Sequence, residues 1–223
     1  MNAIIGYTNM AKKYIDNKQK VSEYLNKAQI SSEHLLSLIS DVLDMSKIEN
    51  ESITIEESPE NIIDSQKEII DIVKQSAANK HINLKYNFTS ILNPNIYMDK
   101  LHVNRIALNI LSNAIKYTKE GGTISYSIEQ LEKTKENSAS FIFTVQDTGI
   151  GMSEDFISHI FEAFERESSS ISSKIPGSGL GMAITKNLID LMKGKIVIHS
   201  ELGKGTTVIY QLTFRLQSDH NTY

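Results

Sequence analysis

The chain has 223 residues, of which 40% are hydrophobic and 22% charged, and its formal net charge is −4. This composition is typical of an ordered globular protein of one or two domains, and the acidic balance argues against a nucleic-acid binder. The sequence contains no cysteine, which excludes disulfides and cysteine-ligated metal sites. Since no apolar run approaches ~20 residues and no signal peptide is visible, we expect a soluble, cytoplasmic chain without membrane contact, or the cytoplasmic portion of a membrane-anchored protein.

The first 50 residues are predicted to form a helical hairpin. A short amphipathic helix over 2–16 is followed by a turn at Asp16–Lys18 and a long helix over 21–50. Apolar residues recur along the long helix in steps of three and four, a coiled-coil-like seam formed by Leu25, Ala28, Leu35, Ile39 and Val42. Because the first helix is about half as long as the second, much of this seam would have no partner within the chain.

The pattern changes near residue 51, where we expect a second domain. We expect a short strand at the start of 52–62 and a boundary at Pro59. Helices are predicted over 61–79, 99–118, 153–161 and 179–192, strands over 82–88, 124–128 and 141–145, and a closing hairpin over 194–216. The Ser-rich stretch 166–179 is predicted to be a loop. This order favours an α+β fold, a two-layer α/β sandwich with a mixed sheet and helices on one face.

The helix expected over 99–118 carries a polar stripe on an otherwise apolar surface. At ~100° per residue, Asn109, Asn113 and Lys116 fall on one narrow face, while Ile, Leu and Ala cover most of the remaining circumference. Burying amides and an ammonium without partners is unfavourable. The stripe is therefore either a narrow solvated edge or a site for a charged ligand, with amide oxygens for a hard cation and the lysine for phosphate.

In "FIFTVQDTGIGM", Phe141, Phe143 and Val145 lie on one side of the expected strand, because alternate residues of a strand point to the same side. Asp147 continues this alternation, so its carboxylate should face the core side at the end of the strand. An inward aspartate needs a donor. It either caps its own turn or accepts a hydrogen bond from a buried ligand, with Gly149 and Gly151 letting the backbone approach closely. In the last strand, Thr206 alternates in step with the inward residues Val208 and Tyr210, so we expect its hydroxyl to line the same pocket.

Three glycines, Gly177, Gly179 and Gly181, stand at a junction between a loop and a helix. Such a turn binds phosphate through free N–H groups and the helix dipole. The signal is weak alone, and it fits neither the dinucleotide-binding nor the P-loop pattern.

Five segments occur in order along the chain: "NILSNAIKYT", "DTGIG", "FEAFERE", "GSGLGMAITKNLI" and "GKGTTVIYQL". They resemble the N, G1, F, G2 and terminal Gly-Thr motifs of sensor histidine kinases, and "LISDVLDMSKIEN" is similar to the end of their dimerisation and phosphotransfer hairpin. The resemblance covers nearly the whole chain. It implies a truncated hairpin over 1–50 and, over 51–218, the ATP-binding sandwich shared with DNA gyrase, mismatch-repair ATPases and heat-shock chaperones.

The resemblance implies ATP and Mg²⁺ as cofactors. Asn113 would bind Mg²⁺, with Asn109 beside it near the phosphates. Asp147 would accept from the adenine amino group, with Thr206 in support. The other implied contacts are Lys116 at a phosphate, Tyr117 near the nucleotide, Gly149 and Gly151 in the adenine pocket, and Gly177, Ser178, Gly179, Leu180 and Gly181 around the phosphates. The Ser-rich loop would be a lid anchored by Phe161 and Phe164, which are otherwise plain core aromatics.

Asn109 separates branches of this family. In the ATP-hydrolysing members, a glutamate that acts as the water base stands four residues before the Mg²⁺-binding asparagine. A neutral amide cannot serve as a general base, so Asn109 favours phosphate transfer over hydrolysis and argues, with the hairpin, against a gyrase-like or chaperone-like ATPase.

The family carries its phosphoacceptor histidine in a His-Glu-x-x-(Arg/Lys)-(Thr/Ser)-Pro box. None of the six histidines lies in such a box; they are His34, His81, His102, His159, His199 and His220. Since "MNAIIGYTNM" resembles the segment just after the box, we expect a truncated core that cannot phosphorylate itself. Expected partners are a second copy, bound weakly through the hairpin, and a response-regulator receiver domain. The alternative is an ATP-dependent regulator or interaction module that is not a kinase.

Overall fold

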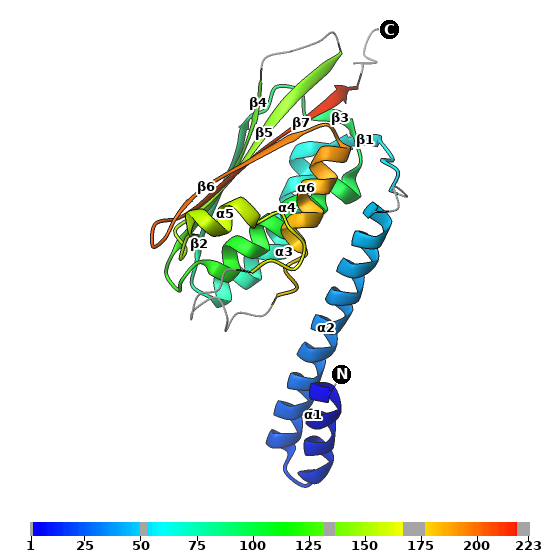
Figure 1. The fold of residues 1–223 in the computed structure, drawn as a ribbon, viewed down its shortest axis with the longest axis vertical. Coiled ribbons are helices and arrows are strands. Elements are labelled where there is room, and N and C mark those ends of the chain that lie inside the picture. The colour runs from blue at the N-terminus through cyan, green and yellow to red at the C-terminus, as the bar shows by residue number, and fades with distance from the viewer. Residues whose placement is uncertain (1, 50–52, 132–136, 167–176, 218–223) are drawn as a thin grey trace. The chain divides into compact units, whose positions relative to one another are not determined.

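The computed structural model describes residues 2–49, 53–131, 137–166 and 177–217. The chain divides into two compact units between Ser52 and Ile53, close to the expected boundary (Figure 1). Within the described ranges, no helix is both long enough and apolar enough to cross a membrane.

The first unit is a hairpin of α1 (Asn2–Lys13) and α2 (Lys18–Glu49). The long helix begins three residues earlier than expected, because the Asn17 side chain accepts the backbone N–H of Lys20 at 3.0 Å and caps it. The turn is held by stacking of Tyr14 on Tyr24, with ring centroids 5.9 Å apart, and the Lys20 ammonium lies 4.3 Å from the Tyr14 ring. The predicted antiparallel hairpin is confirmed.

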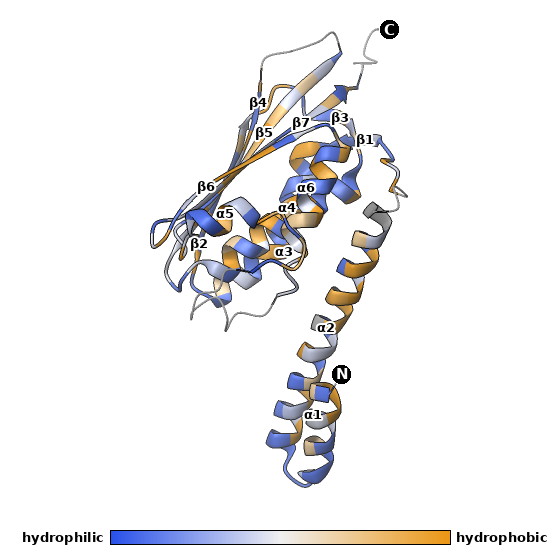
Figure 2. Ribbon diagram, viewed as in Figure 1, coloured by the Kyte–Doolittle hydropathy of each residue, from blue (hydrophilic) through white to orange (hydrophobic). Residues whose placement is uncertain are grey.

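The apolar seam of α2 is largely unpaired. Ala11 and Ala28 are buried where the two helices meet. Farther along α2 lies a row of apolar side chains that are 48–65% exposed: Leu36, Ile39, Val42 and Leu43. In Figure 2, several turns of α2 beyond the end of α1 are coloured hydrophobic. Within the described part of the hairpin, the seam is thus largely exposed.

The second unit contains a mixed seven-stranded sheet with the order β1-β3-β7-β5-β4-β2, and β6 also pairs with β7. Its strands are β1 (Ser58–Asn61), β2 (Asn83–Ser90), β3 (Asn95–Met98), β4 (Thr123–Gln130), β5 (Ser138–Asp147), β6 (Lys195–Glu201) and β7 (Gly205–Leu216). The β2–β4 pair is parallel, whereas β5 pairs antiparallel with both β4 and β7.

The helices of this unit are α3 (Ile62–Asn79), α4 (Lys100–Tyr117), α5 (Glu154–His159) and α6 (Gly181–Leu191). Helices α3, α4 and α6 cover one side of the sheet (Figure 1). Between the two layers lie fully buried aromatic rings, including Phe143 stacked on Tyr210 with centroids 4.5 Å apart. This two-layer arrangement confirms the predicted α+β sandwich.

Two details of the strand prediction were wrong. The strand expected ahead of Pro59 lies over Ser58–Asn61 and includes that proline. Because β1 is an edge strand that pairs with β3, a residue without a backbone N–H is tolerated there. The four-residue strand β3 was not predicted, since it is too short for its alternation to stand out, although Ile96 and Met98 are fully buried.

A buried polar network connects the helices to the sheet. Gln66 of α3 is fully buried, and its Oε1 accepts a hydrogen bond from the Tyr126 hydroxyl of β4 at 2.7 Å. Its Nε2 donates to Asn104 Oδ1 of α4 at 2.9 Å, and the Ser65 hydroxyl donates to the same oxygen at 2.7 Å. The nearby Tyr210 hydroxyl is also buried; it interacts with the Tyr126 hydroxyl but forms no hydrogen bond of good geometry with a described residue.

These two tyrosines predict unequal outcomes for the same change. Tyr126→Phe should lower the free energy of unfolding by about 1–3 kcal/mol, because Gln66 loses a donor in a buried site. Tyr210→Phe removes a hydroxyl whose interaction with Tyr126 has poor geometry, so the loss of stability should be clearly smaller. Urea unfolding of both variants measures the difference, and equal destabilisation would contradict the network.

Candidate functional site

Helix α4 carries the polar stripe, and both of its ends are fixed by side chains. At its start, Asp99 Oδ1 accepts the backbone N–H of His102 at 3.0 Å, and Oδ2 accepts the backbone N–H of Glu56 at 2.9 Å. Burial alone would raise the pKa of Asp99, but the hydrogen bonds from His102 and Glu56 outweigh it and lower the pKa. At its end, Lys80 Nζ donates to the carbonyl oxygens of Ile115 and Lys116, both at 2.8 Å.

The three stripe residues are partly exposed, whereas the apolar face of the same helix is buried: Val103, Ile106, Ala107, Ile110, Leu111, Ala114 and Ile115. Asn109 is tied to α6, since its Nδ2 donates to Thr185 Oγ1 at 2.6 Å. The Lys116 ammonium lies 4.8 Å from the centroid of the Tyr117 ring. Asn113 shares the same stripe one turn after Asn109. Helix α4 thus presents two amides and an ammonium on one face, and Asn109 of this face contacts α6.

The glycine segment that leads into α6 lies directly against this stripe. A Cβ added to Gly181 would stand 2.4 Å from Asn109 Oδ1, and one added to Gly177 would stand 2.4 Å from Lys116 Nζ. Gly179 has a φ of 75°, a left-handed conformation that favours glycine. Leu180 is buried, so only its backbone is available to a ligand. The structure thus brings the predicted N and G2 residues together.

Asp147 closes strand β5 and is only 9% exposed. It pairs in register with Ile124 of β4 and Thr206 of β7. Its Oδ1 accepts the backbone N–H of Gly149 at 2.8 Å, as expected of an aspartate that caps its own turn. Burial raises the pKa of this carboxyl, and hydrogen bonds from the backbone N–H groups of Gly149 and Thr206 offset only part of the rise.

The loop after Asp147 packs so closely that glycine is needed at two of its positions, Gly149 and Gly151. A Cβ on Gly149 would lie 2.6 Å from Asp147 Oδ1 and 2.8 Å from the Tyr117 carbonyl oxygen. The Ile150 N–H donates to that same carbonyl at 3.2 Å. Gly151, with a φ of 65°, packs so closely that a Cβ would lie 1.9 Å from the Glu201 carbonyl oxygen. The end of α4 and the end of β5 therefore meet at one place.

The Thr206 hydroxyl contacts the neighbouring strand β6. It lies 2.8 Å from Ser200 Oγ of β6, while the backbone of Thr206 pairs with Asp147. Ser200 in turn donates to the Gly205 carbonyl at 2.9 Å and accepts the Met152 N–H at 2.9 Å. Sequence reasoning did not single out Ser200, Gly205 or Thr185, although Gly205 and Thr185 lie inside segments that carry the family resemblance.

Phe164 is not a core aromatic, because it is 67% exposed. It adopts a φ of 69°, which is rare for a bulky residue, and its N–H donates to the Gly179 carbonyl at 3.1 Å. Phe161 is half-buried. The backbone at Phe164 thus contacts the glycine segment, whereas the Ser-rich stretch expected between them falls mostly on residues 167–176, outside the described ranges.

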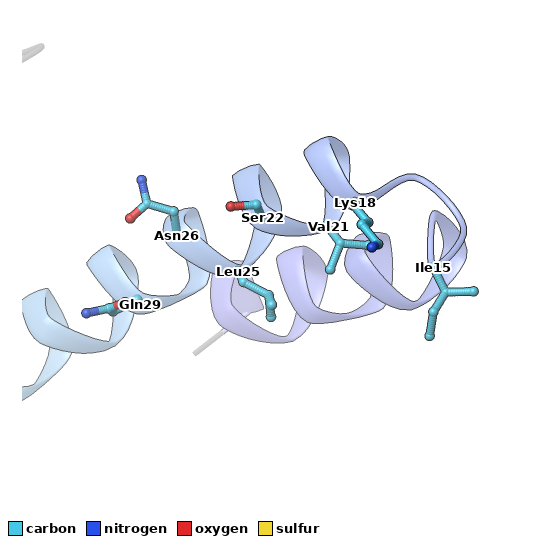
Figure 3. A pocket seen from close by; sticks show the side chains of 7 residues that line it. All are labelled: Ile15, Lys18, Val21, Ser22, Leu25, Asn26 and Gln29. Carbon is cyan, nitrogen blue, oxygen red and sulfur yellow. The ribbon is translucent and has the colours of Figure 1, made fainter.

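A separate groove lies on the hairpin near its turn. Figure 3 shows its lining residues, which combine apolar side chains with one lysine and several neutral polar groups: Ile15, Lys18, Val21, Ser22, Leu25, Asn26 and Gln29. Ile15 and Leu25 are 71% and 51% exposed. This groove contains none of the predicted site residues, so it is a surface feature of the hairpin alone.

Two family models match the chain. The "Histidine kinase-, DNA gyrase B-, and HSP90-like ATPase" model matches residues 98–218, and the "His Kinase A (phospho-acceptor) domain" model matches residues 1–51. The fold and these matches define two parts of the chain: an N-terminal hairpin of the phosphoacceptor type, and after it a domain of the ATPase class. The chain therefore belongs to the histidine kinase-, DNA gyrase B- and HSP90-like ATPase family and, within it, to the sensor histidine kinases.

Individual relatives agree with this family. The autoinducer 2 sensor kinase/phosphatase LuxQ of Vibrio harveyi is 32% identical over 212 residues, which are 95% of this chain and 24% of LuxQ. The structure of full-length ShkA in complex with AMPPNP is 27% identical with a TM-score of 0.75, covering 96% of this chain and 44% of ShkA. Histidine kinase ThkA in complex with response regulator TrrA has a TM-score of 0.68 at 19% identity, covering 94% and 56%.

The chain spans about a quarter of the length of the curated relatives it matches. The predicted family, fold class and ATP-binding character are confirmed by these comparisons. The roles of individual site residues are not tested by them and stay predictions.

Proposed function

We propose that this chain is the ATP-binding core of a sensor histidine kinase, and that it transfers the γ-phosphate of ATP to a histidine outside its own 223 residues. The observation that carries the proposal is Asp147, a buried carboxylate at a strand end, next to a polar stripe and a glycine segment that meet at the start of α6.

The adenine base is proposed to bind at Asp147. The carboxylate would accept a hydrogen bond from the exocyclic amino group, which supplies the donor that a buried aspartate needs. Gly149 fits this role, because its missing Cβ leaves Asp147 Oδ1 and the Tyr117 carbonyl uncovered. The backbone N–H groups of Gly149 and Thr206 hold the carboxylate in place.

The phosphates are proposed to bind between α4 and the glycine segment. Lys116 supplies a positive charge beside Gly177, and the first N–H groups of α6 supply donors. Among the described residues, no group of three or more His, Asp or Glu side chains is arranged for a metal. Mg²⁺ would therefore be held mainly by the phosphates and by amide oxygen, for which Asn113 fits in residue type and position. When bound, Mg²⁺ would neutralise phosphate charge.

Phosphate transfer is favoured over hydrolysis by Asn109. Its amide is held by Thr185 and cannot take a proton from water near neutral pH. The chain's own contribution is to orient the nucleotide and to leave the γ-phosphate for an incoming imidazole.

The hairpin is proposed to pair with a second copy of the chain. The row of exposed apolar side chains on α2 and the groove near the turn are the surfaces that a four-helix bundle would cover (Figures 2 and 3). A response-regulator receiver domain is the proposed recipient of the phosphate, supported by the phosphoacceptor-type hairpin and by the ThkA–TrrA complex.

Labelling with γ-³²P ATP tests the proposal. The chain alone should bind ATP yet acquire no acid-labile, base-stable label, because none of its histidines lies in an acceptor box. The same chain extended before Met1 by a helix that carries a His-Glu-x-x-Lys-Thr-Pro box should become labelled, and Asp147→Asn in that extended chain should be labelled far more slowly at limiting ATP. Stable label on a histidine of the unextended chain would refute the acceptor assignment. ATP binding without transfer to the supplied box would favour a regulator that is not a kinase.

A further inference from the structure

Thr185 is a buried polar residue to which neither the sequence motifs nor the family matches give a role. It lies on α6, is 1% exposed, and its Oγ1 accepts a hydrogen bond from Asn109 Nδ2 at 2.6 Å. The two residues are 76 positions apart in sequence. This contact joins the helix that carries the polar stripe to the helix that follows the glycine segment.

The bond holds the Asn109 amide against α6. An asparagine side chain presents an oxygen acceptor on one side and an NH₂ donor on the other. With the NH₂ group at Thr185, the oxygen lies beside Gly181, one turn earlier on the same helix. A Cβ at Gly181 would stand 2.4 Å from this oxygen and 3.0 Å from the nitrogen, so only glycine leaves room for the amide there.

The orientation matters for the chemistry of a bound nucleotide. An amide oxygen is a ligand for a hard cation and repels phosphate oxygens, whereas an NH₂ group would do the reverse. We infer that Thr185 is a positioning residue, which holds the Asn109 side chain at the start of α6 with its amide oxygen available to the phosphate-bound Mg²⁺ ion. The inference rests on the proposed function and adds a second amide oxygen to that of Asn113.

The test compares Thr185→Val with Thr185→Ser. Valine keeps the branched shape inside the helix but has no hydroxyl, whereas serine keeps the hydroxyl. For each protein, the affinity for ATP is measured by calorimetry with Mg²⁺ and again with EDTA. The readout is the factor by which Mg²⁺ strengthens binding. Thr213→Val is a matched control, because it removes a hydroxyl bonded to Ser140 at 2.7 Å on the sheet.

Thr185→Val should reduce the strengthening by Mg²⁺ about threefold to tenfold, the value of one hydrogen bond, and leave the affinity in EDTA unchanged. Thr185→Ser and Thr213→Val should match the unaltered chain. In an Asn109→Ala background, Thr185→Val should have no further effect, because the amide it orients is absent.

Three results would overturn the inference. Thr185→Val could weaken binding equally with and without Mg²⁺, it could leave both affinities unchanged, or Thr185→Ser could show the same loss as Thr185→Val. The first and third results would assign Thr185 a packing role. By contrast, failure of the unaltered chain to bind ATP at all would overturn the proposed function itself, and the two failures are therefore distinguishable.

Discussion

Asp147→Asn should weaken ATP binding about tenfold to a hundredfold while the fold remains intact. A hydrogen bond to a charged group contributes about 1.5–3 kcal/mol, and the substitution removes that charge without changing the shape of the side chain. The carboxylate is 9% exposed and its Oδ1 is held by the Gly149 N–H, so the asparagine can occupy the same place. Calorimetric titration with ATP–Mg²⁺ measures the loss.

The same variant should be more stable than the unaltered chain at neutral pH. Burial raises the pKa of Asp147 in the folded chain above its value in the unfolded chain, so ionisation of this carboxyl disfavours folding. As the pH falls through the raised pKa, the folded chain takes up the proton and this cost disappears. The stability gain of Asp147→Asn should therefore be largest near pH 7 and shrink in acid.

Asp71→Asn is the matched control, since it makes the same charge change on the exposed face of α3. It should leave the ATP affinity unchanged. If Asp147→Asn left the ATP titration unchanged, Asp147 would not be the adenine-binding residue.

Gly205→Ala should be strongly damaging at the site, and Gly203→Ala in the same turn should be mild. Both glycines have positive φ, 106° and 80°. A Cβ on Gly205 would lie 2.0 Å from the Asp147 carbonyl oxygen, whereas one on Gly203 meets nothing within 4 Å. Each change carries the cost of a left-handed alanine, about 1–2 kcal/mol, and Gly205→Ala adds a backbone clash of about 1–3 kcal/mol.

Thermal and urea unfolding, with ATP titration of the folded protein, separate the two effects. Gly203→Ala should bind ATP normally after a modest loss of stability. Gly205→Ala should lose more stability and also weaken ATP binding, because the clash displaces the end of β5 that carries Asp147. Equal behaviour of the two variants would show that the close packing at Gly205 does not support the site.

Much of the fold follows from local patterns. Helix α4 begins at Lys100 and ends at Tyr117, within one residue of the expected bounds, because its apolar period is strong and Gly121 and Gly122 follow closely. The strands β4, β5 and β7 alternate clearly and were likewise predicted. Strand β3 could not be predicted, since four residues between a proline and an aspartate carry too little periodicity.

The site was predictable only where one element carries several of its residues. Asn109, Asn113 and Lys116 share a stripe that helical geometry makes visible. Thr185 was missed, because its role depends on the packing of α6 against α4, and no local pattern reports a contact across 76 residues.

The alternation of residues along the last strand correctly indicated that Thr206 lies beside Asp147, with which it pairs in the sheet. It did not show that the hydroxyl would be engaged by Ser200, because that contact comes from the neighbouring strand β6.

The exposure of Phe164 is a similar case. Its sequence context is equally consistent with a core aromatic and a loop anchor, and the choice depends on a left-handed backbone conformation that a propensity argument assigns to glycine or asparagine.

The most direct test of the account compares ATP with the triphosphate of purine riboside, which lacks only the 6-amino group. If Asp147 accepts a hydrogen bond from that group, the unaltered chain should bind ATP about tenfold to a hundredfold more tightly than the analogue. Asp147→Asn should lose most of this preference. Equal affinity of the unaltered chain for the two nucleotides, or no binding of either, would contradict an ATP site built on Asp147.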